Sequence, residues 1–220
     1  MDWPNFAHVN WGYVVIVLIV VFVSMVLHEL IHGVVAYWLG DTTAKDEGRL
    51  TLNPLKHIDP FLTILLPLLL AITGMPIFGG AKPVPFRPDR VKGGDWGAAL
   101  VSLAGPLTNL VLAFICFAVL AIFQIGGTGL GEQILVAGVI VNLGFFAFNI
   151  LPIPPLDGSR LLYAVAPSAV RKLMEAMEHV GLITIFIIVM VASPLISNIM
   201  NYIIGFILMI FSRIFGVGII

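Results

Sequence analysis

Residues 11–40 form an apolar stretch in which Glu29 is the only charged residue. About 20 apolar residues span the hydrocarbon core of a bilayer, and a helix satisfies its backbone hydrogen bonds internally. The rest of the chain is similar, because 60% of all residues are hydrophobic and 10% are charged. Soluble domains carry about 25% charged residues. The sequence therefore predicts an all-α polytopic membrane protein, with residues 1–220 in a single membrane-embedded domain.

The hydropathy pattern predicts five to six transmembrane helices. Five apolar segments qualify as spans: 11–39, 96–125, 134–151, 180–191 and 199–215. The pair Ser193-Pro194 predicts a helix end between the last two segments. A sixth segment, 61–78, has Pro67 in its middle, which predicts either a kinked span or a re-entrant segment packed against protein.

Two connecting segments are predicted to be extended, with short β character. Residues 48–54 alternate like a strand, and the prolines within residues 81–86 forbid a helix. Extended backbone beside an intramembrane site offers an edge to which a stretched peptide could add as a strand. The alternative is a pair of ordinary surface loops.

His28, Glu29 and His32 form the motif His-Glu-Leu-Ile-His inside the first apolar segment. On a helix, residues i and i+4 share a face, and two imidazoles at this spacing suit one zinc ion. A charged residue at membrane depth is costly, so it indicates a functional site. The alternative is a pair of core histidines hydrogen-bonded across the bundle. We predict one Zn²⁺ per chain, with Glu29 as general base towards a zinc-bound water.

A catalytic zinc commonly has three protein ligands and keeps a fourth position for water. Asp157 is the candidate third ligand, because it follows an apolar helix and a proline-rich stretch, 152–155, that prevents ordinary helix. The alternative for Asp157 is a helix-terminal turn at the membrane interface. Asn149 offers either a neutral N–H donor for a developing oxyanion or a structural hydrogen bond to freed backbone.

Five ordered motifs resemble the site-2 protease family of intramembrane zinc metalloproteases, in its compact prokaryotic branch without PDZ or CBS domains. The motifs are HELIHG (28–33), GRLTLNPLKHIDP (48–60), GAKPVPF (80–86), SLAGPLTN (102–109) and NILPIPPLDG (149–158). The resemblance covers residues 12–165. It implies that His28, His32 and Asp157 bind zinc. It also implies that Glu29 is catalytic and that Asn149 assists the transition state.

The resemblance also implies that Gly105, Pro106 and Asn109 line a neighbouring core helix, and His57 matches a family histidine of unassigned role. From the motifs and the extended segments together, we expect substrate contacts at Asn53, Pro54, His57, Lys82, Pro83 and Asn109.

The sequence thus predicts a zinc metalloendopeptidase that cleaves in or near the transmembrane segment of a membrane-protein substrate, as in regulated intramembrane proteolysis. The expected partners are this substrate and the lipid bilayer, and the net charge of −1 argues against nucleic acid. Three alternatives remain: a membrane metal-binding or transport protein, a zinc protease of another lineage with a glutamate as third ligand, and a catalytically inactive helix-binding homologue.

Parity and charge predict the topology. His28 and Asp157 lie near the C-terminal ends of their helices, so these helices should run in the same direction, and residues 40–95 should begin and end on one face. All eleven Lys and Arg residues fall on that face if both of the last two segments span. The positive-inside rule then predicts a multi-pass protein of the cell membrane with an outside N-terminus, a cytoplasmic C-terminus and a site nearer the cytoplasm.

Overall fold

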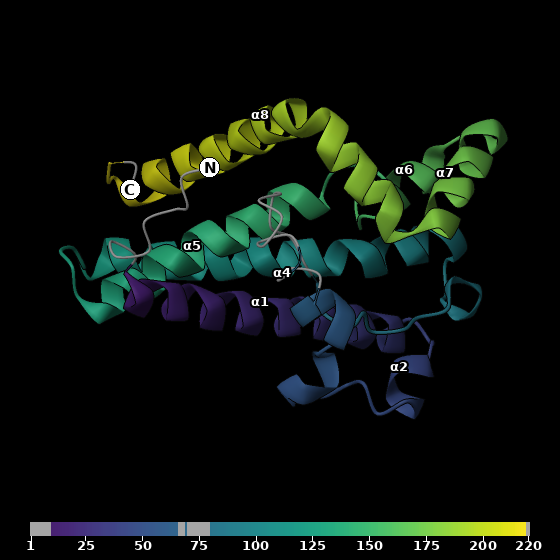
Figure 1. Cartoon of the computed structure of the whole chain (residues 1–220), viewed down its shortest axis with the longest axis horizontal. Helices are drawn as coiled ribbons and strands as arrows, with labels where there is room; N and C mark the ends of the chain where they lie inside the picture. Colours follow the sequence, from purple (N-terminus) through teal and green to yellow (C-terminus); the bar gives the residue numbers. More distant parts are fainter. Residues whose placement is uncertain (1–9, 66–68, 70–79, 219–220) are drawn as a thin grey trace.

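The structure is a computed structural model that describes residues 10–65, 69 and 80–218. Four long apolar helices lie side by side in it (Figure 1), and each is long and apolar enough to cross a membrane. They are α1 (Trp11–Trp38), α4 (Gly94–Ile122), α5 (Leu130–Asn149) and α8 (Leu182–Phe215). The predicted all-α architecture is confirmed. The predicted number of spans, five to six, is not confirmed, because the described residues contain four candidate spans.

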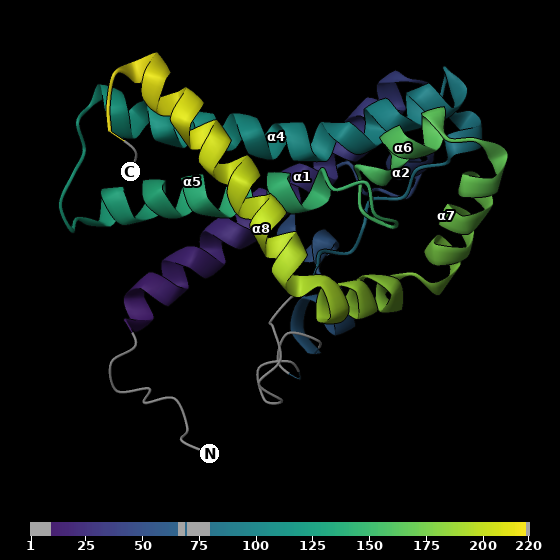
Figure 2. The same ribbon diagram turned by 90° about the horizontal axis from the view of Figure 1, so that it is seen from above.

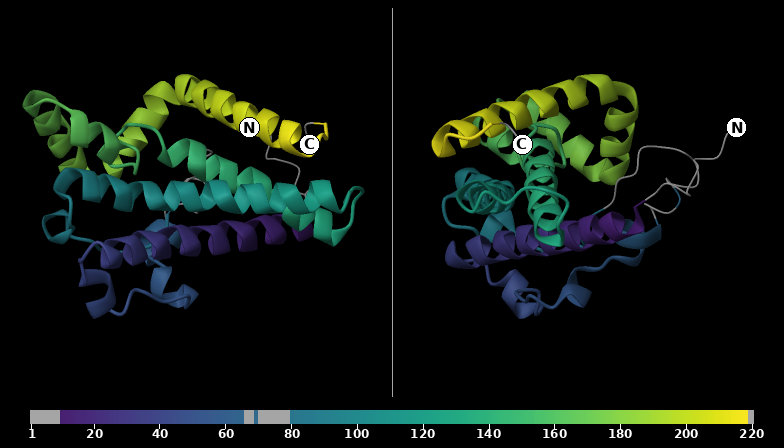
Figure 3. Two further views of the ribbon diagram at one scale, coloured as in Figure 1. Left: turned by 180° about the vertical axis from the view of Figure 1, so that it is seen from behind. Right: turned by 90° about the vertical axis from the view of Figure 1, so that its left-hand side faces the viewer.

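The helix directions match the parity prediction. Figure 1 and Figure 3 show α1 and α5 running in the same direction, with α4 antiparallel to both. These three helices pack against one another. Seen from above, α8 crosses α5 obliquely (Figure 2). The C-terminal half of α1 and the end of α5 therefore meet at one end of the bundle.

An apolar core holds α4, α5 and α8 together. Phe117 and Leu143 are fully buried in it, and the ring of Phe117 lies 5.5 Å from that of Phe211 in an edge-to-face contact. The outward faces of the long helices carry exposed apolar side chains such as Leu18, Leu107 and Val191. In water such faces would be costly, but a lipid bilayer covers them.

The helix α8 corrects one prediction. Residues 182–191 and 199–215 belong to one kinked helix, with non-helical φ/ψ at Ala192 (φ −111°, ψ 17°) and with Pro194 inside it, whereas Val180 ends α7 (Ser168–Val180). Proline removes a backbone hydrogen bond and bends a helix, but the apolar sequence continues on both sides, so the helix resumes. The C-terminal end of α8 and the start of α1 lie at the same end of the bundle (Figure 1), which does not match the prediction of termini on opposite sides.

The connection from α1 to α4 returns to the end of the bundle that it left. The Lys92 amide donates to the Leu39 carbonyl at 2.8 Å, just after the end of α1. Between them the described residues form four short helices: α2 (Thr43–Asp46), the 3₁₀ helices η2 (Pro54–His57) and η4 (Pro88–Arg90), and the π-helical η3 (Pro60–Leu65). Most of the segment 61–78, predicted to be kinked or re-entrant, lies outside the described residues.

The extended segments 48–54 and 81–86 are not β-strands in the part of the chain that the structure describes. Residues 81–86 form no helix or strand, and Pro83 and Pro85 have no N–H group to give to a ladder. The guanidinium of Arg49, rather than a neighbouring strand, donates to the Lys82 and Pro83 carbonyls at 2.8 and 3.2 Å. Both segments are therefore loops held by side chains.

The basic residues gather on the connections at one end of the bundle. All of the eleven Lys and Arg residues except Arg213 lie in residues 40–93 or 158–172, which join helices at the end where α1 and α5 finish. The second of these regions forms α6 (Ser159–Val165) and the first part of α7 (Ser168–Val180). Arg213 lies in the last turn of α8, at the other end, because α8 is one helix rather than two.

Candidate metal centre

His28 and His32 are buried on α1, and Asp157 reaches them from the loop that follows α5. The Nε2 atom of His28 lies 3.1 Å from both His32 Nε2 and Asp157 Oδ2, and His32 Nε2 lies 3.5 Å from Asp157 Oδ2. A tetrahedral zinc ion with bonds of about 2.0–2.1 Å sets its ligand atoms about 3.3 Å apart. The triangle of these three atoms therefore fits one zinc ion.

Hydrogen bonds fix which nitrogen of each imidazole faces this triangle. His32 Nδ1 lies 2.7 Å from the Val101 carbonyl oxygen, which only accepts, so Nδ1 carries the proton. His28 Nδ1 lies 2.6 Å from Asn109 Oδ1. In the neutral imidazoles both Nε2 atoms then point lone pairs at the Asp157 oxygen. Three acceptors that face one another in this way form a site that can hold a metal ion. The alternative predicted from the sequence was a hydrogen-bonded histidine pair.

A chain of buried amides sets the orientation of Asn109. The Gly138 carbonyl accepts from Asn142 Nδ2 at 2.8 Å, and Asn142 Oδ1 accepts from Asn109 Nδ2 at 2.9 Å. This leaves Asn109 Oδ1 to accept from His28. Because the chain starts at a backbone carbonyl, it allows one direction only. Partners of this kind orient metal-binding histidines and raise their basicity.

The position of Asp157 follows from the way α5 ends. The helix stops at Asn149, as the prolines predicted, and the Gly158 amide donates to the Asn149 carbonyl at 2.7 Å. A Cβ atom at Gly158 would lie 2.1 Å from the Ile150 oxygen, so only glycine allows this closed loop. The Asp157 Oδ2 atom is buried and accepts no hydrogen bond among the described residues, so its carboxylate can supply negative charge for a bound cation.

Gly105 on α4 lets that helix approach both imidazoles. A Cβ atom at this position would lie 2.4 Å from His32 Nε2 and 2.7 Å from His28 Cε1. Gly105, Pro106 and Asn109 are all buried on α4, at the place that the resemblance implied. A side chain at Gly105 would therefore collide with both imidazoles.

Glu29 lies on α1 between the two histidines but outside the triangle of ligand atoms. Its Oε2 atom accepts a hydrogen bond of 2.9 Å from the Val84 amide, and its side chain is partly buried. This contact leaves Oε1 available to a water molecule. Glu29 is therefore not one of the three residues whose ligand atoms meet.

The other predicted site residues fall into two groups. Asn53, Pro54, Lys82 and Pro83 are exposed on the loops around the site, where a substrate could reach them. His57 and Asn109 are completely buried, so their side chains cannot touch a substrate as we had expected. Asn149 Nδ2 donates to the Phe145 carbonyl at 3.1 Å, one turn earlier in its own helix. This contact uses one of its two N–H donors.

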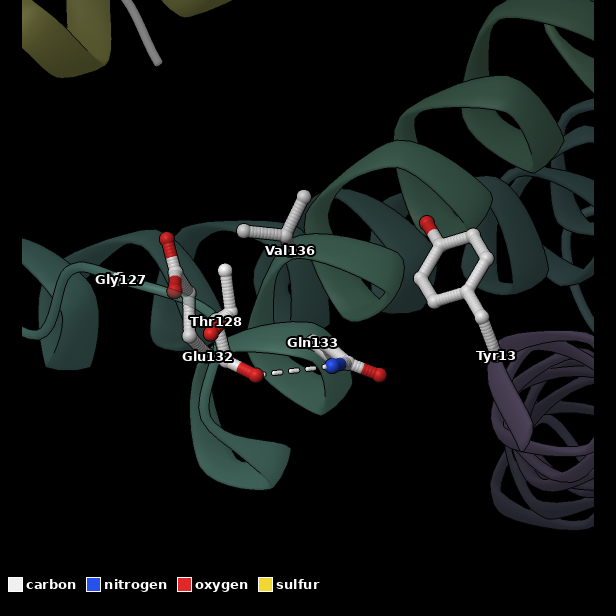
Figure 4. Close-up of a pocket in the computed structure, with 6 residues that line it drawn as sticks. All are labelled: Tyr13, Gly127, Thr128, Glu132, Gln133 and Val136. Atoms are coloured by element: carbon white, nitrogen blue, oxygen red, sulfur yellow. Dashed lines mark hydrogen bonds between the residues drawn. The ribbon is translucent and has the colours of Figure 1, made fainter. Parts of the chain in front are cut away.

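A pocket at the other end of the bundle is unrelated to this centre. Figure 4 shows it between the first turns of α1 and the turn that leads into α5, lined by Tyr13, Gly127, Thr128, Glu132, Gln133 and Val136. Tyr13 precedes His28 by about four helical turns, which corresponds to roughly 22 Å at 1.5 Å per residue.

The buried amide chain leads to a first prediction. Asn109→Leu keeps the volume but removes the acceptor for His28, so the zinc affinity should fall about 10–100-fold. Competition with a fluorescent zinc chelator measures this affinity. Thr108→Ala is the control, because Thr108 lies beside Asn109 and its hydroxyl bonds only to the Ala104 carbonyl of its own helix among the contacts described. An unchanged affinity in Asn109→Leu would assign Asn109 to packing alone.

Comparisons with known proteins agree with the geometry. A family model described as peptidase family M50 matches residues 128–193. YwhC of Bacillus subtilis, named as a zinc metalloprotease, is 44% identical over 184 residues, which cover 80% of this chain and 79% of the relative. Rip2 of Mycolicibacterium smegmatis, also named as a zinc metalloprotease, is 33% identical over 189 residues, or 81% of this chain and 68% of the relative. No solved structure gives a significant match.

Proposed function

Because the chain belongs to peptidase family M50, we propose that it is an intramembrane protease that hydrolyses peptide bonds in or near the transmembrane segment of membrane-protein substrates. This is the family that the five motifs predicted. Its relatives are zinc metalloproteases, and the cofactor is Zn²⁺. The observation that carries the proposal is the buried triangle of His28 Nε2, His32 Nε2 and Asp157 Oδ2 inside a bundle of membrane-spanning helices.

We assign the zinc ligands to His28, His32 and Asp157 and the general base to Glu29. Zinc, when bound, supplies Lewis acidity towards the attacking water and the scissile carbonyl. Glu29 accepts the proton of that water at Oε1, because Oε2 is engaged by the Val84 amide. It then returns the proton to the leaving amine. A metal-transport site has no use for a base placed in this way.

Asn149 is proposed to assist through its remaining N–H donor. Its backbone carbonyl accepts from the Gly158 amide, so the last turn of α5 lies next to the loop that carries Asp157. A neutral amide donor can stabilise a developing oxyanion without competing for the metal. The contact with Phe145 supports this role in so far as it fixes the side chain in one orientation.

The substrate must present an unwound segment to this site, because the amides of an intact helix are already hydrogen-bonded. The exposed residues Asn53, Pro54, Lys82 and Pro83 are proposed to contact that extended segment. They belong to loops, so pairing would use loop backbone rather than the edge of a sheet.

We propose that the end of the bundle nearest the metal centre faces the cytoplasm of a multi-pass protein in the cell membrane. Ten of the eleven Lys and Arg residues, all except Arg213, lie on connections at that end. The positive-inside rule assigns such an end to the cytoplasm. The four candidate spans among the described residues would then place the start of α1 and the end of α8 on the outer side.

One experiment tests the proposed function. The full chain is purified in detergent, its zinc content is measured, and it is incubated with several single-span membrane proteins. We expect cleavage within or beside the span, reversible inhibition by 1,10-phenanthroline and no inhibition by serine-protease reagents. Zinc-loaded protein that cleaves none of the substrates, or cleavage that survives chelation, would contradict the proposal.

A further inference from the structure

The segment 82–87 lies directly against the helix that carries the zinc motif. A Cβ atom at Gly33, one residue after His32, would lie 2.7 Å from Val84 Cγ1 and 2.6 Å from Leu50 Cδ2. The glycine therefore lets two loops approach α1 within a turn of Glu29. Ala81 and Val84 are buried in this contact, while Lys82 and Pro83 face outwards.

Hydrogen bonds from three other parts of the chain hold the backbone of this segment. The Lys82 amide donates to the His57 carbonyl at 2.8 Å, and Arg49 Nη2 donates to the Lys82 and Pro83 carbonyls at 2.8 and 3.2 Å. The Arg87 amide donates to Asp41 Oδ2 at 2.6 Å. Between these anchors, the Val84 amide donates to Glu29.

The anchoring side chains are buried, which is unusual for charged residues in a connecting loop. Asp41 is 0% exposed and Arg49 is 6% exposed. His57 is 0% exposed and its Nε2 lies 2.8 Å from the Thr51 carbonyl oxygen, so it fixes the turn that presents its own carbonyl to Lys82. Burial of a charge costs free energy unless hydrogen bonds replace the lost water. Here those hydrogen bonds go to the backbone of the loop beside Glu29.

Asp41 and Arg49 differ in charge, but both bind backbone groups of the segment 82–87. Asp41 Oδ1 accepts hydrogen bonds from the amide and hydroxyl of Thr43, which hold the carboxylate just after the end of α1. Asp41 Oδ2 accepts from the Arg87 amide. Arg49 comes from the loop after α2 and reaches the segment from its other end. Together they fix residues on both sides of Val84.

We propose that Asp41 and Arg49 are positioning residues for catalysis: they fix segment 82–87 so that the Val84 amide orients the carboxylate of Glu29. The inference rests on the proposed function, because it takes Glu29 as the general base. The Val84 amide holds Oε2, which fixes where Oε1 meets the water. A misplacement of about 1 Å can cost roughly 10²-fold in rate.

Kinetics of Arg49 variants provide the first test. Arg49→Met keeps the aliphatic stem but removes the donors, so kcat should fall about 10²-fold while the zinc content stays unchanged. Arg49→Lys retains a donor and should recover part of kcat. Arg213→Met is the matched control, because Arg213 is exposed in the last turn of α8, at the other end of the bundle. Equal kcat values in Arg49→Met and Arg213→Met would overturn the proposal.

A thermal comparison tests the contact without using activity. Val84→Pro removes the amide donor, whereas Val84→Ala shortens the side chain and keeps the donor. The difference in Tm between the two variants should shrink when both are made in a Glu29→Ala background, because the acceptor is then gone. The same difference in both backgrounds would overturn the Val84–Glu29 contact.

The two tests separate the possible failures. A wild-type protein without hydrolytic activity would refute the proposed function, and the thermal comparison would still decide whether Val84 holds Glu29. If Arg49→Met does not fold, Asp41→Asn replaces it, because the amide keeps the size of the side chain and loses the charge that binds the Arg87 and Thr43 amides.

Discussion

Glu29→Gln is expected to abolish hydrolysis of single-span substrates while the protein keeps its zinc. The amide has the shape of the carboxylate, and its oxygen can still accept from the Val84 amide. It cannot take a proton from water, and general-base catalysis contributes about 10²–10⁴-fold. Zinc content should be unaffected, because the Glu29 oxygens lie outside the triangle of ligand atoms.

The measurement is the cleavage rate of a purified substrate, with zinc per chain determined on the same sample. Glu47→Gln serves as the control, since Glu47 is an exposed residue that ends the short helix α2. Cleavage by Glu29→Gln at the wild-type rate would remove Glu29 from the mechanism. Loss of zinc in the variant would instead make Glu29 a ligand, contrary to the geometry.

The parts of this centre that the sequence predicted are those with local signals. His28 and His32 share a helix face because of the 3.6-residue period, which any helix imposes. The proline-rich stretch 152–155 ends α5, and Asp157 comes after it in the loop. Long stretches without charged residues predicted the spans, because about 20 apolar residues in a helix match the thickness of the hydrocarbon core.

The sequence could not predict contacts made by backbone groups of distant segments. The Val101 carbonyl that holds His32 and the Val84 amide that holds Glu29 have no signature, since nearly every residue carries these groups. The sequence also did not predict that Asn109 and His57 are buried, because we took the polar residues of these motifs as substrate contacts.

Proline positions predicted the ends of helices least reliably, because the effect of a proline depends on the neighbouring residues and their packing. Pro194 bends α8 without ending it, since apolar residues continue beyond it and packing against α4 and α5 favours a resumed helix. The prolines at 152–155 do end α5, where three of them in four positions remove several hydrogen bonds at once. Pro83 and Pro85 keep residues 81–86 out of a helix, and they cannot donate to a strand ladder either.

Asp157→Ala is expected to lose zinc and therefore all activity. The substitution removes the one negative charge of the ligand triangle and leaves two neutral imidazoles, which is too few ligands for a catalytic zinc site. The loss of affinity should exceed that of Asn109→Leu, which alters only the support of one ligand. His28→Ala and His32→Ala should have the same result.

The variant should still fold, which keeps this prediction decisive. The loop around Asp157 is closed by backbone contacts, above all the Gly158 amide on the Asn149 carbonyl, and none of these uses the Asp157 side chain. Elemental analysis of the detergent-purified protein gives zinc per chain, and Asp89→Ala is the control because Asp89 is exposed on η4. A zinc content equal to that of the control would exclude Asp157 as a ligand.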